Sequence, residues 1–251
     1  MASYEITKEG ITLKVEGAVA TLINDRPEFK NGLDWKAKEF QAECYRKIAA
    51  EPDLRVLVFK GTGEYFWTGG RVDASRPGEK ELYAKAIEHV EEARRLMNLP
   101  IIAAVNGKCF KGGIGIVAQA DMAVAKKSAT FSFPEVRMGG VPMVVMARCM
   151  RYLPKKLALE AYYSSEEFPA QRFYECGLLN AVCEDEEFDE VIDRYVHKII
   201  DYPESLINMT RKAYYAMEAI ADDAERVAFS QKMLAEEVLV QMTKEKTVYN
   251  P

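Results

Sequence analysis

The feature that most constrains the fold is a short apolar run followed closely by a group of glycines. Ile101–Val105 is partly β-branched and is bounded by a proline and an Asn-Gly pair, which is typical of a buried strand that ends in a turn. Gly112, Gly113 and Gly115 follow, and apolar residues come directly after them. This pattern predicts a buried strand that leads, through a turn, into a helix opened by glycines.

The start of such a helix can hold a negatively charged oxygen. The first N–H groups of a helix have no intrahelical partner and lie at the positive end of its dipole. The glycines could equally serve only to bring the helix close to the sheet. A second apolar run, Val56–Phe59, is also followed by glycines, including Gly69 and Gly70. We therefore expect two similar units, each of which delivers a backbone turn to the same place.

The remaining pattern alternates strands with helices and then becomes helical. Strands are predicted over Ile11–Glu16, Val19–Ile23 and Met122–Ala125, and helices over Trp35–Ala50, Lys155–Tyr163 and Phe188–Ile200. Two or three further helices are predicted from Pro203 to Thr247, including Ala221–Met242. We predict a core over residues 1–201 and a C-terminal helical region over residues 202–251.

Over nearly all of its length the chain resembles the crotonase, or enoyl-CoA hydratase/isomerase, superfamily. The resemblance runs from Val19–Ile23 and Arg26–Asn31 to Ala170–Val182. It implies an α/β fold, namely a crotonase-like spiral of ββα units with a C-terminal helical oligomerisation segment. It also implies assembly into a homotrimer or hexamer.

The resemblance assigns the catalytic groups. In this family two backbone N–H groups hold a thioester carbonyl and stabilise its enolate, and the matching positions are Gly70 and Gly112. The family's catalytic carboxylate follows a proline and matches Glu135. From the residues alone, the apolar neighbours of Glu135 should raise its pKa toward the range useful for proton transfer. The alternative is a surface glutamate paired with Arg137.

One departure from the family pattern bears on the reaction. Many hydratases of this family carry a second glutamate at the position that is Gly115 here. A single carboxylate suits several reactions, of which enoyl-thioester hydration or 3-hydroxyacyl-thioester dehydration ranks first. A Δ3-Δ2 double-bond isomerase, a decarboxylase of an acyl thioester and a thioester-binding scaffold without turnover are the alternatives. Locally the chain is most similar to dehydratases of polyketide β-branching.

The resemblance further implies that the substrate carries CoA or phosphopantetheine and that no other cofactor is needed. The acyl chain, and the choice between an acyl-CoA and an acyl-carrier-protein thioester, stay open. The predicted substrate-binding residues are Phe29, Lys30, Thr68, Gly69, Gly70, Arg71, Lys111, Met143 and Lys212.

Composition and spacing argue against other classes of protein. A net charge of −5 gives no drive toward nucleic acid, and no apolar run approaches the roughly 20 residues that cross a membrane. The five cysteines lack the spacing of a metal site or a disulfide framework. His89 and His197, the two histidines, lie in charged helical runs, and no nucleophile elbow accompanies them. Without a signal sequence at the N-terminus, we expect a cytoplasmic protein.

Overall fold

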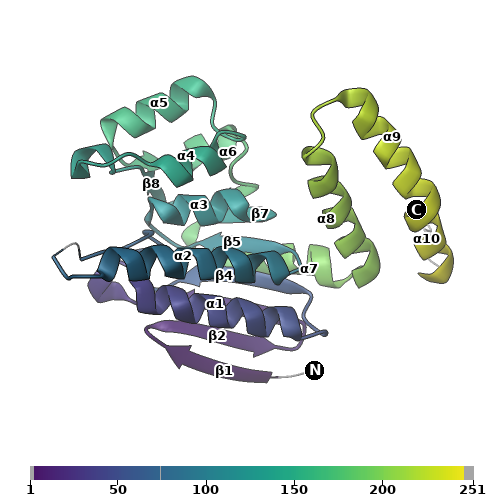
Figure 1. Ribbon diagram of the computed structural model, residues 1–251, viewed down its shortest axis with the longest axis horizontal. Coiled ribbons are helices and arrows are strands. Elements are labelled where there is room, and N and C mark those ends of the chain that lie inside the picture. The colour runs from purple at the N-terminus through teal and green to yellow at the C-terminus, as the bar shows by residue number, and fades with distance from the viewer. Residues whose placement is uncertain (1–2, 74, 246–251) are drawn as a thin grey trace.

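The main sheet runs through the whole core. The computed structural model describes residues 3–73 and 75–245, within which this sheet has seven strands in the order β1-β2-β3-β4-β5-β7-β10 (Figure 1). β1 and β3 each pair with β2 in antiparallel fashion, and all later neighbouring strands, from β3–β4 onward, pair in parallel. The strands are β1 Ser3–Lys8, β2 Ile11–Glu16, β3 Val19–Asn24, β4 Val56–Gly61, β5 Ile101–Val105, β7 Met122–Lys126 and β10 Ala181–Cys183.

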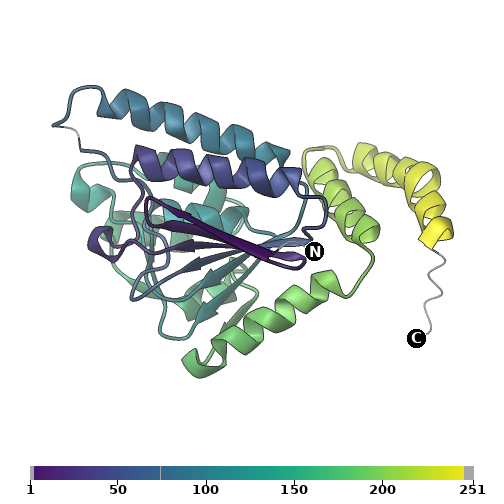
Figure 2. The ribbon, with the colours of Figure 1, turned by 90° about the horizontal axis from the view of Figure 1, so that it is seen from below.

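Helices cover both faces of this sheet. α1 (Trp35–Ala50) and α2 (Glu79–Leu96) lie side by side over one face, and α7 (Phe188–Ile200) lies over the other (Figures 1 and 2). Because successive strand residues point to opposite faces, Val56 and Val58 pack toward α7 while Leu57 and Phe59 join the core beneath α1. A strand buried on both faces must be apolar throughout, which is why the uninterrupted apolar runs predicted strands correctly.

A second, small sheet brings distant parts of the chain together. Its strands are β6 (Cys109–Phe110), β8 (Thr130–Ser132) and β9 (Phe168–Pro169). β6 and β8 are parallel, so their carboxyl ends lie at the same edge of the sheet. The helix α3 (Gly112–Gln119) begins two residues after β6, and Glu135 follows β8 closely. The small sheet therefore places the glycine turn next to the predicted carboxylate.

Three short helices complete this part of the core beside α3 (Figure 1). They are α4 (Met143–Cys149), α5 (Lys155–Ser164) and α6 (Ala170–Glu175), and the 3-10 turns are η1 (Pro27–Phe29), η2 (Val136–Met138) and η3 (Asp185–Glu187). Across residues 3–73 and 75–245, no helix has the length and apolar character that crossing a membrane requires.

The C-terminal helices stand apart from the sheet in both views (Figures 1 and 2). They are α8 (Glu204–Glu218), α9 (Asp223–Met233), the π-helix η4 (Leu234–Val238) and α10 (Leu239–Glu245). The predicted helices of this region are confirmed up to residue 245, and residues 246 and 247 lie outside the described residues. Leu234, Leu239 and Val240 are exposed, as an oligomer contact would require. Oligomerisation and the boundary near residue 202 stay predictions.

Asp121 ties the C-terminal helices to the sheet. Its Oδ2 accepts hydrogen bonds from the Ile101 N–H at 2.7 Å and from Arg211 Nε at 3.0 Å. Its Oδ1 accepts one from the Tyr215 hydroxyl at 2.7 Å. Arg211 and Tyr215 belong to α8, so one carboxylate joins the start of β5 to that helix.

Replacing Asp121 with alanine should destabilise the protein by about 3 kcal/mol, because the change leaves a mostly buried guanidinium without its counter-charge. Urea unfolding of the variant measures this loss. The matched control is Asp193→Ala in α7, where the carboxylate is exposed, and we expect a change of at most about 0.5 kcal/mol. Equal losses in the two variants would contradict the anchoring role of Asp121.

Candidate active site

Two glycine turns from different units lie in direct contact. A methyl group built on Gly112 would lie 2.9 Å from the Cα of Gly69 and 3.9 Å from the nitrogen of Gly70. Gly69 has a φ of +77°, a conformation that side chains disfavour. Glycine is therefore required here because the two backbones touch, and the contact brings the Gly70 and Gly112 amides near one another.

Both of these amides are free to bind an oxygen atom. Leu33 donates its N–H to Gly69 O at 2.9 Å, and Arg71 donates its N–H to Leu33 O at 2.8 Å. The Gly70 N–H between these two bonds points away from Leu33. Gly112 is the first residue of α3 and has no intrahelical acceptor. Neither N–H donates a hydrogen bond within the part of the chain that the structure describes, so the pair can hold a carbonyl oxygen that gains negative charge.

Lys111 connects the two turns in a strained conformation. Its φ of 50° and ψ of −125° are rare for a residue with a side chain. Its N–H donates to Ser132 O at 3.1 Å, and its Nζ donates to Gly70 O at 3.5 Å. Burial lowers the pKa of Lys111, and the charge on Glu135 acts in the opposite direction. Backbone strain of this kind is tolerated where the surrounding contacts hold it, often at functional sites.

Glu135 is a partly buried carboxylate at the start of η2. Its Oε2 is buried and has no hydrogen-bond partner among the described residues. Burial raises the pKa of Glu135, a bond to its own backbone opposes the rise, and Lys111 opposes it further. The alternative of a surface pair does not hold, since Glu135 and Arg137 form no salt bridge within residues 75–245. The environment therefore suits a group that takes up and releases a proton.

The raised pKa of Glu135 predicts a pH-dependent gain of stability on replacement by glutamine. Above the unfolded pKa, near 4.5, the buried charge destabilises the folded state, and this cost grows as pH rises through the raised pKa. Glutamine carries no charge, so Glu135→Gln should melt above the wild type at about pH 8 and close to it at about pH 4. Thermal unfolding at both pH values checks this. Glu166→Gln, a change at an exposed site, is the control and should show no such difference.

The position of the absent second glutamate is occupied by a neighbouring side chain. A Cβ on Gly115 would lie 3.3 Å from Arg148 Nη1 and 3.4 Å from Arg148 Cδ. Arg148 forms a short ion pair with Glu91 of α2. Burial alone would raise the pKa of Glu91, but Arg148 and Arg94 lower it below its usual value. Glu91 is therefore held ionised and paired beside α3.

A residue that the sequence reasoning missed packs against the first turn. A Cβ on Gly70 would lie only 1.9 Å from the hydroxyl oxygen of Tyr83, so the phenol rests directly on this glycine. Burial, with a smaller effect of the charge on Asp34, raises the pKa of Tyr83 to about 12. The hydroxyl is therefore protonated beside the paired amides. No local pattern marks Tyr83, because its contact with Gly70 depends on how α2 packs.

Several predicted substrate-binding residues gather beside these turns. Two guanidinium groups contact the Phe29 ring, with Arg71 at 4.3 Å and Arg26 at 4.7 Å from its centroid. Thr68 donates its hydroxyl to Lys30 O at 2.8 Å. Phe29 and Arg71 also line a polar pocket together with Arg26, Asp34, Lys36, Asp73, Arg76 and Glu79. Glu9 and Trp35 complete the lining, so the pocket has four carboxylates and four positive side chains, with Arg26 paired to Asp34 and Arg76 paired to Asp73.

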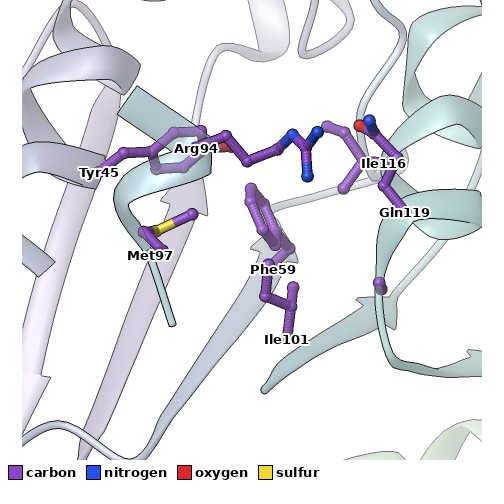
Figure 3. Close-up of a pocket in the computed structure, with 8 residues that line it drawn as sticks. Tyr45, Phe59, Arg94, Met97, Ile101, Ile116 and Gln119 are labelled. Carbon is purple, nitrogen blue, oxygen red and sulfur yellow. The ribbon is translucent and has the colours of Figure 1, made fainter. Parts of the chain in front are cut away.

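The remaining predicted binding residues, Met143 and Lys212, lie on α4 and α8. Met143 is exposed at the start of α4. Lys212 lies on α8 and pairs with Glu237 of η4 at 3.1 Å, so this chain does not bring it to the glycine turns. A small pocket between α1, α2 and α3 contains no predicted site residue, and Arg94 reaches across it toward Ile116 and Gln119 (Figure 3).

Neither Cys109 nor the two histidines has surroundings that indicate a catalytic role. Cys109 is fully buried, and burial raises its pKa well above the usual value, so its thiol is unreactive. His89 contacts Glu39 at 2.8 Å, and His197 contacts Asp201 at 2.9 Å. Among the described residues, no group of three or more His, Cys, Asp and Glu side chains is arranged to hold a metal ion.

Comparison with known proteins gives consistent matches. The family model described as enoyl-CoA hydratase/isomerase matches residues 14–249. The chain is 28% identical over 207 residues to (E)-benzylidenesuccinyl-CoA hydratase of Thauera aromatica, covering 81% of each chain. It is 31% identical over 179 residues to carnitinyl-CoA dehydratase of Proteus mirabilis, covering 69% of this chain and 68% of the other. The crystal structure of human enoyl-CoA hydratase domain-containing protein 3 shares the fold, with a TM-score of 0.85, 19% identity and coverage of 97% and 100%.

Proposed function

The chain belongs to the enoyl-CoA hydratase/isomerase family, and we propose that it adds water to an enoyl thioester, or removes water from a 3-hydroxyacyl thioester, with Glu135 as its acid and base. The observation that carries the proposal is the contact between the two glycine turns, with the buried carboxylate of Glu135 following the strand paired to β6. The two relatives are named as a hydratase and a dehydratase of CoA thioesters, and these names support the addition or removal of water.

The proposed mechanism begins with the thioester carbonyl oxygen bound by the Gly70 and Gly112 amides. These amides stabilise the negative charge that reaches this oxygen as the enolate forms, and one such donor is typically worth roughly 3 kcal/mol in the transition state. In hydration, the Glu135 carboxylate takes a proton from water while the water oxygen bonds to the β-carbon. Glu135 then returns the proton to the α-carbon, and dehydration is the reverse sequence.

Substrate binding follows from the same surroundings. The relatives act on CoA thioesters by name, so we propose CoA as the carrier. The Arg71 guanidinium over Phe29, with Lys30 nearby, would meet its anionic part. Lys111 would lie close to the thioester, and Met143 would contact the outer part of the acyl chain. No cofactor beyond the CoA of the substrate enters this scheme.

Double-bond isomerisation is the second candidate function. The observation that favours it is the Arg148 side chain, which lies beside Gly115 where many hydratases carry a second glutamate. With that space filled, Glu135 is the carboxylate expected to move protons at the turns. A single carboxylate can carry a proton from the γ-carbon to the α-carbon of the same enolate.

The test is mass spectrometry of 3-hydroxyacyl, 2-enoyl and 3-enoyl CoA thioesters incubated with the protein in D₂O. Gain or loss of one water mass supports the proposal and ranks the acyl chains. Deuterium uptake with no gain or loss of a water mass, together with movement of the double bond, would contradict the proposal and indicate isomerisation. Loss of carbon dioxide would indicate decarboxylation, and inactivity with every thioester would favour a binding scaffold.

A further inference from the structure

Glu135 and Tyr162 each carry a buried oxygen atom that lacks a hydrogen-bond partner among the described residues. Six buried side-chain nitrogen or oxygen atoms lack a hydrogen-bond partner within residues 3–73 and 75–245, and Glu135 Oε2 and Tyr162 Oη are two of them. Buried polar atoms in native proteins almost always have a partner, and exceptions mark a water, a ligand or a catalytic role. The charge of Glu135 acts on Tyr162, so these two atoms share one electrostatic environment in which a third molecule can bind both.

Packing places the Tyr162 ring beside the segment that carries Glu135. Tyr162 lies on α5 and is 3% exposed. Its ring meets Phe133 edge to face, with centroids 4.8 Å apart and an interplanar angle of 87°. Phe133 is two residues before Glu135 and is fully buried. Burial mainly, with contributions from the charges of Cys149 and Glu135, raises the pKa of Tyr162 to about 12, so the hydroxyl keeps its proton.

The chemistry of hydration needs a second polar group at this point. Glu135 can accept one proton of a water molecule, but a water held by one hydrogen bond is free to rotate away from the β-carbon. Gly115 offers no side chain, and Arg148 fills the adjoining space with its charge paired to Glu91. A neutral hydroxyl that is buried and unpartnered can take this role without a further buried charge.

We propose that Tyr162 is a catalytic residue whose hydroxyl oxygen holds the reacting water together with Glu135. The assignment rests on the proposed hydration and dehydration. As the water oxygen bonds to the β-carbon, one of its protons passes to Glu135, and the electrons of the double bond move toward the carbonyl oxygen. Tyr162 accepts a hydrogen bond from the other O–H of the water and keeps its own proton. In dehydration the same contact orients the departing hydroxyl.

The experiment compares Tyr162→Phe with Tyr163→Phe. The two residues are adjacent on α5, but Tyr163 is 71% exposed, so its variant is a matched control for the same chemical change. We expect Tyr162→Phe to lower kcat for hydration roughly 100-fold with little change in KM, since a misplaced reactant typically costs that much. Deuterium exchange at the α-carbon of a 3-hydroxyacyl CoA in D₂O should persist, because Glu135 and the paired amides suffice for it. Tyr163→Phe should match the wild type in both assays.

Thermal unfolding separates this role from a structural one. Removing a hydroxyl that has no partner should leave the melting temperature of Tyr162→Phe unchanged or higher. Hydration by Tyr162→Phe at the rate of the wild type would overturn the assignment and leave the proposed function intact. Equal losses of hydration and exchange, or a lowered melting temperature, would also overturn it, because Tyr162 would then support the fold or Glu135 itself. A wild type inactive with every thioester would overturn both proposals.

Discussion

Glu135→Gln should lower the rate of hydration or dehydration by about 10³-fold or more, at the upper end of what a positioned acid and base contributes. Glutamine has nearly the same shape as glutamate, but it cannot take a proton from water or return one to the α-carbon. The paired Gly70 and Gly112 amides are unchanged in this variant, so binding of the thioester should persist. The measurements are kcat for the best thioester of the panel and calorimetric binding of an unreactive acyl-CoA.

The control for this change is Glu166→Gln, which replaces an exposed glutamate of the segment after α5. It should retain the activity of the wild type, which would exclude a general effect of lost charge. A loss of less than about 10-fold in Glu135→Gln would contradict the proposed role, since general acid–base catalysis typically contributes at least 10²-fold. Loss of binding together with turnover would instead indicate that Glu135 serves the substrate pocket.

Gly113→Ala is expected to have the largest effect on stability. A Cβ at this position would lie 1.8 Å from the carbonyl oxygen of Trp67 and 2.6 Å from its carbonyl carbon. That carbonyl accepts the Phe110 N–H at 3.1 Å, and the Trp67 side chain is 1% exposed, so neither backbone can move cheaply. We expect a loss of about 4 kcal/mol in the free energy of unfolding, or failure to fold, because overlap in the core is among the most costly changes.

Gly115→Ala is the matched control in the same helix. Its Cβ would meet the end of the flexible Arg148 side chain at 3.3 Å, which can yield, and alanine favours a helix over glycine by roughly 1 kcal/mol. We therefore expect a change within about 1 kcal/mol by denaturant unfolding. Similar stabilities for the two variants would contradict the close packing of α3 on the Trp67 segment.

The pattern of apolar residues and glycines along the chain predicted much of the fold, because it depends directly on which residues are buried. The strands predicted over Ile11–Glu16 and Val19–Ile23, the β4 and β5 strands and the helix opened by Gly112 are all present with nearly the predicted bounds. A strand buried on both faces has to be apolar, and a helix whose first turn leaves no room for a Cβ beside the Trp67 carbonyl has to begin with glycine. The raised pKa of Glu135 was also predicted from sequence, and burial is its main cause, although Val136 and Met138 beside it in the chain are exposed.

The sequence by itself determined the family, the alternation of strands and helices, and the absence of a glutamate at position 115. Only the tertiary structure decided that Arg148 fills the space beside Gly115, that Tyr83 rests on Gly70 and that Tyr162 packs against Phe133 with its hydroxyl unpartnered. These contacts join residues from different helices and turns. The physical reason is that strand and helix patterns depend on neighbours along the chain, whereas the surroundings of a catalytic group depend on side chains that packing brings from far away.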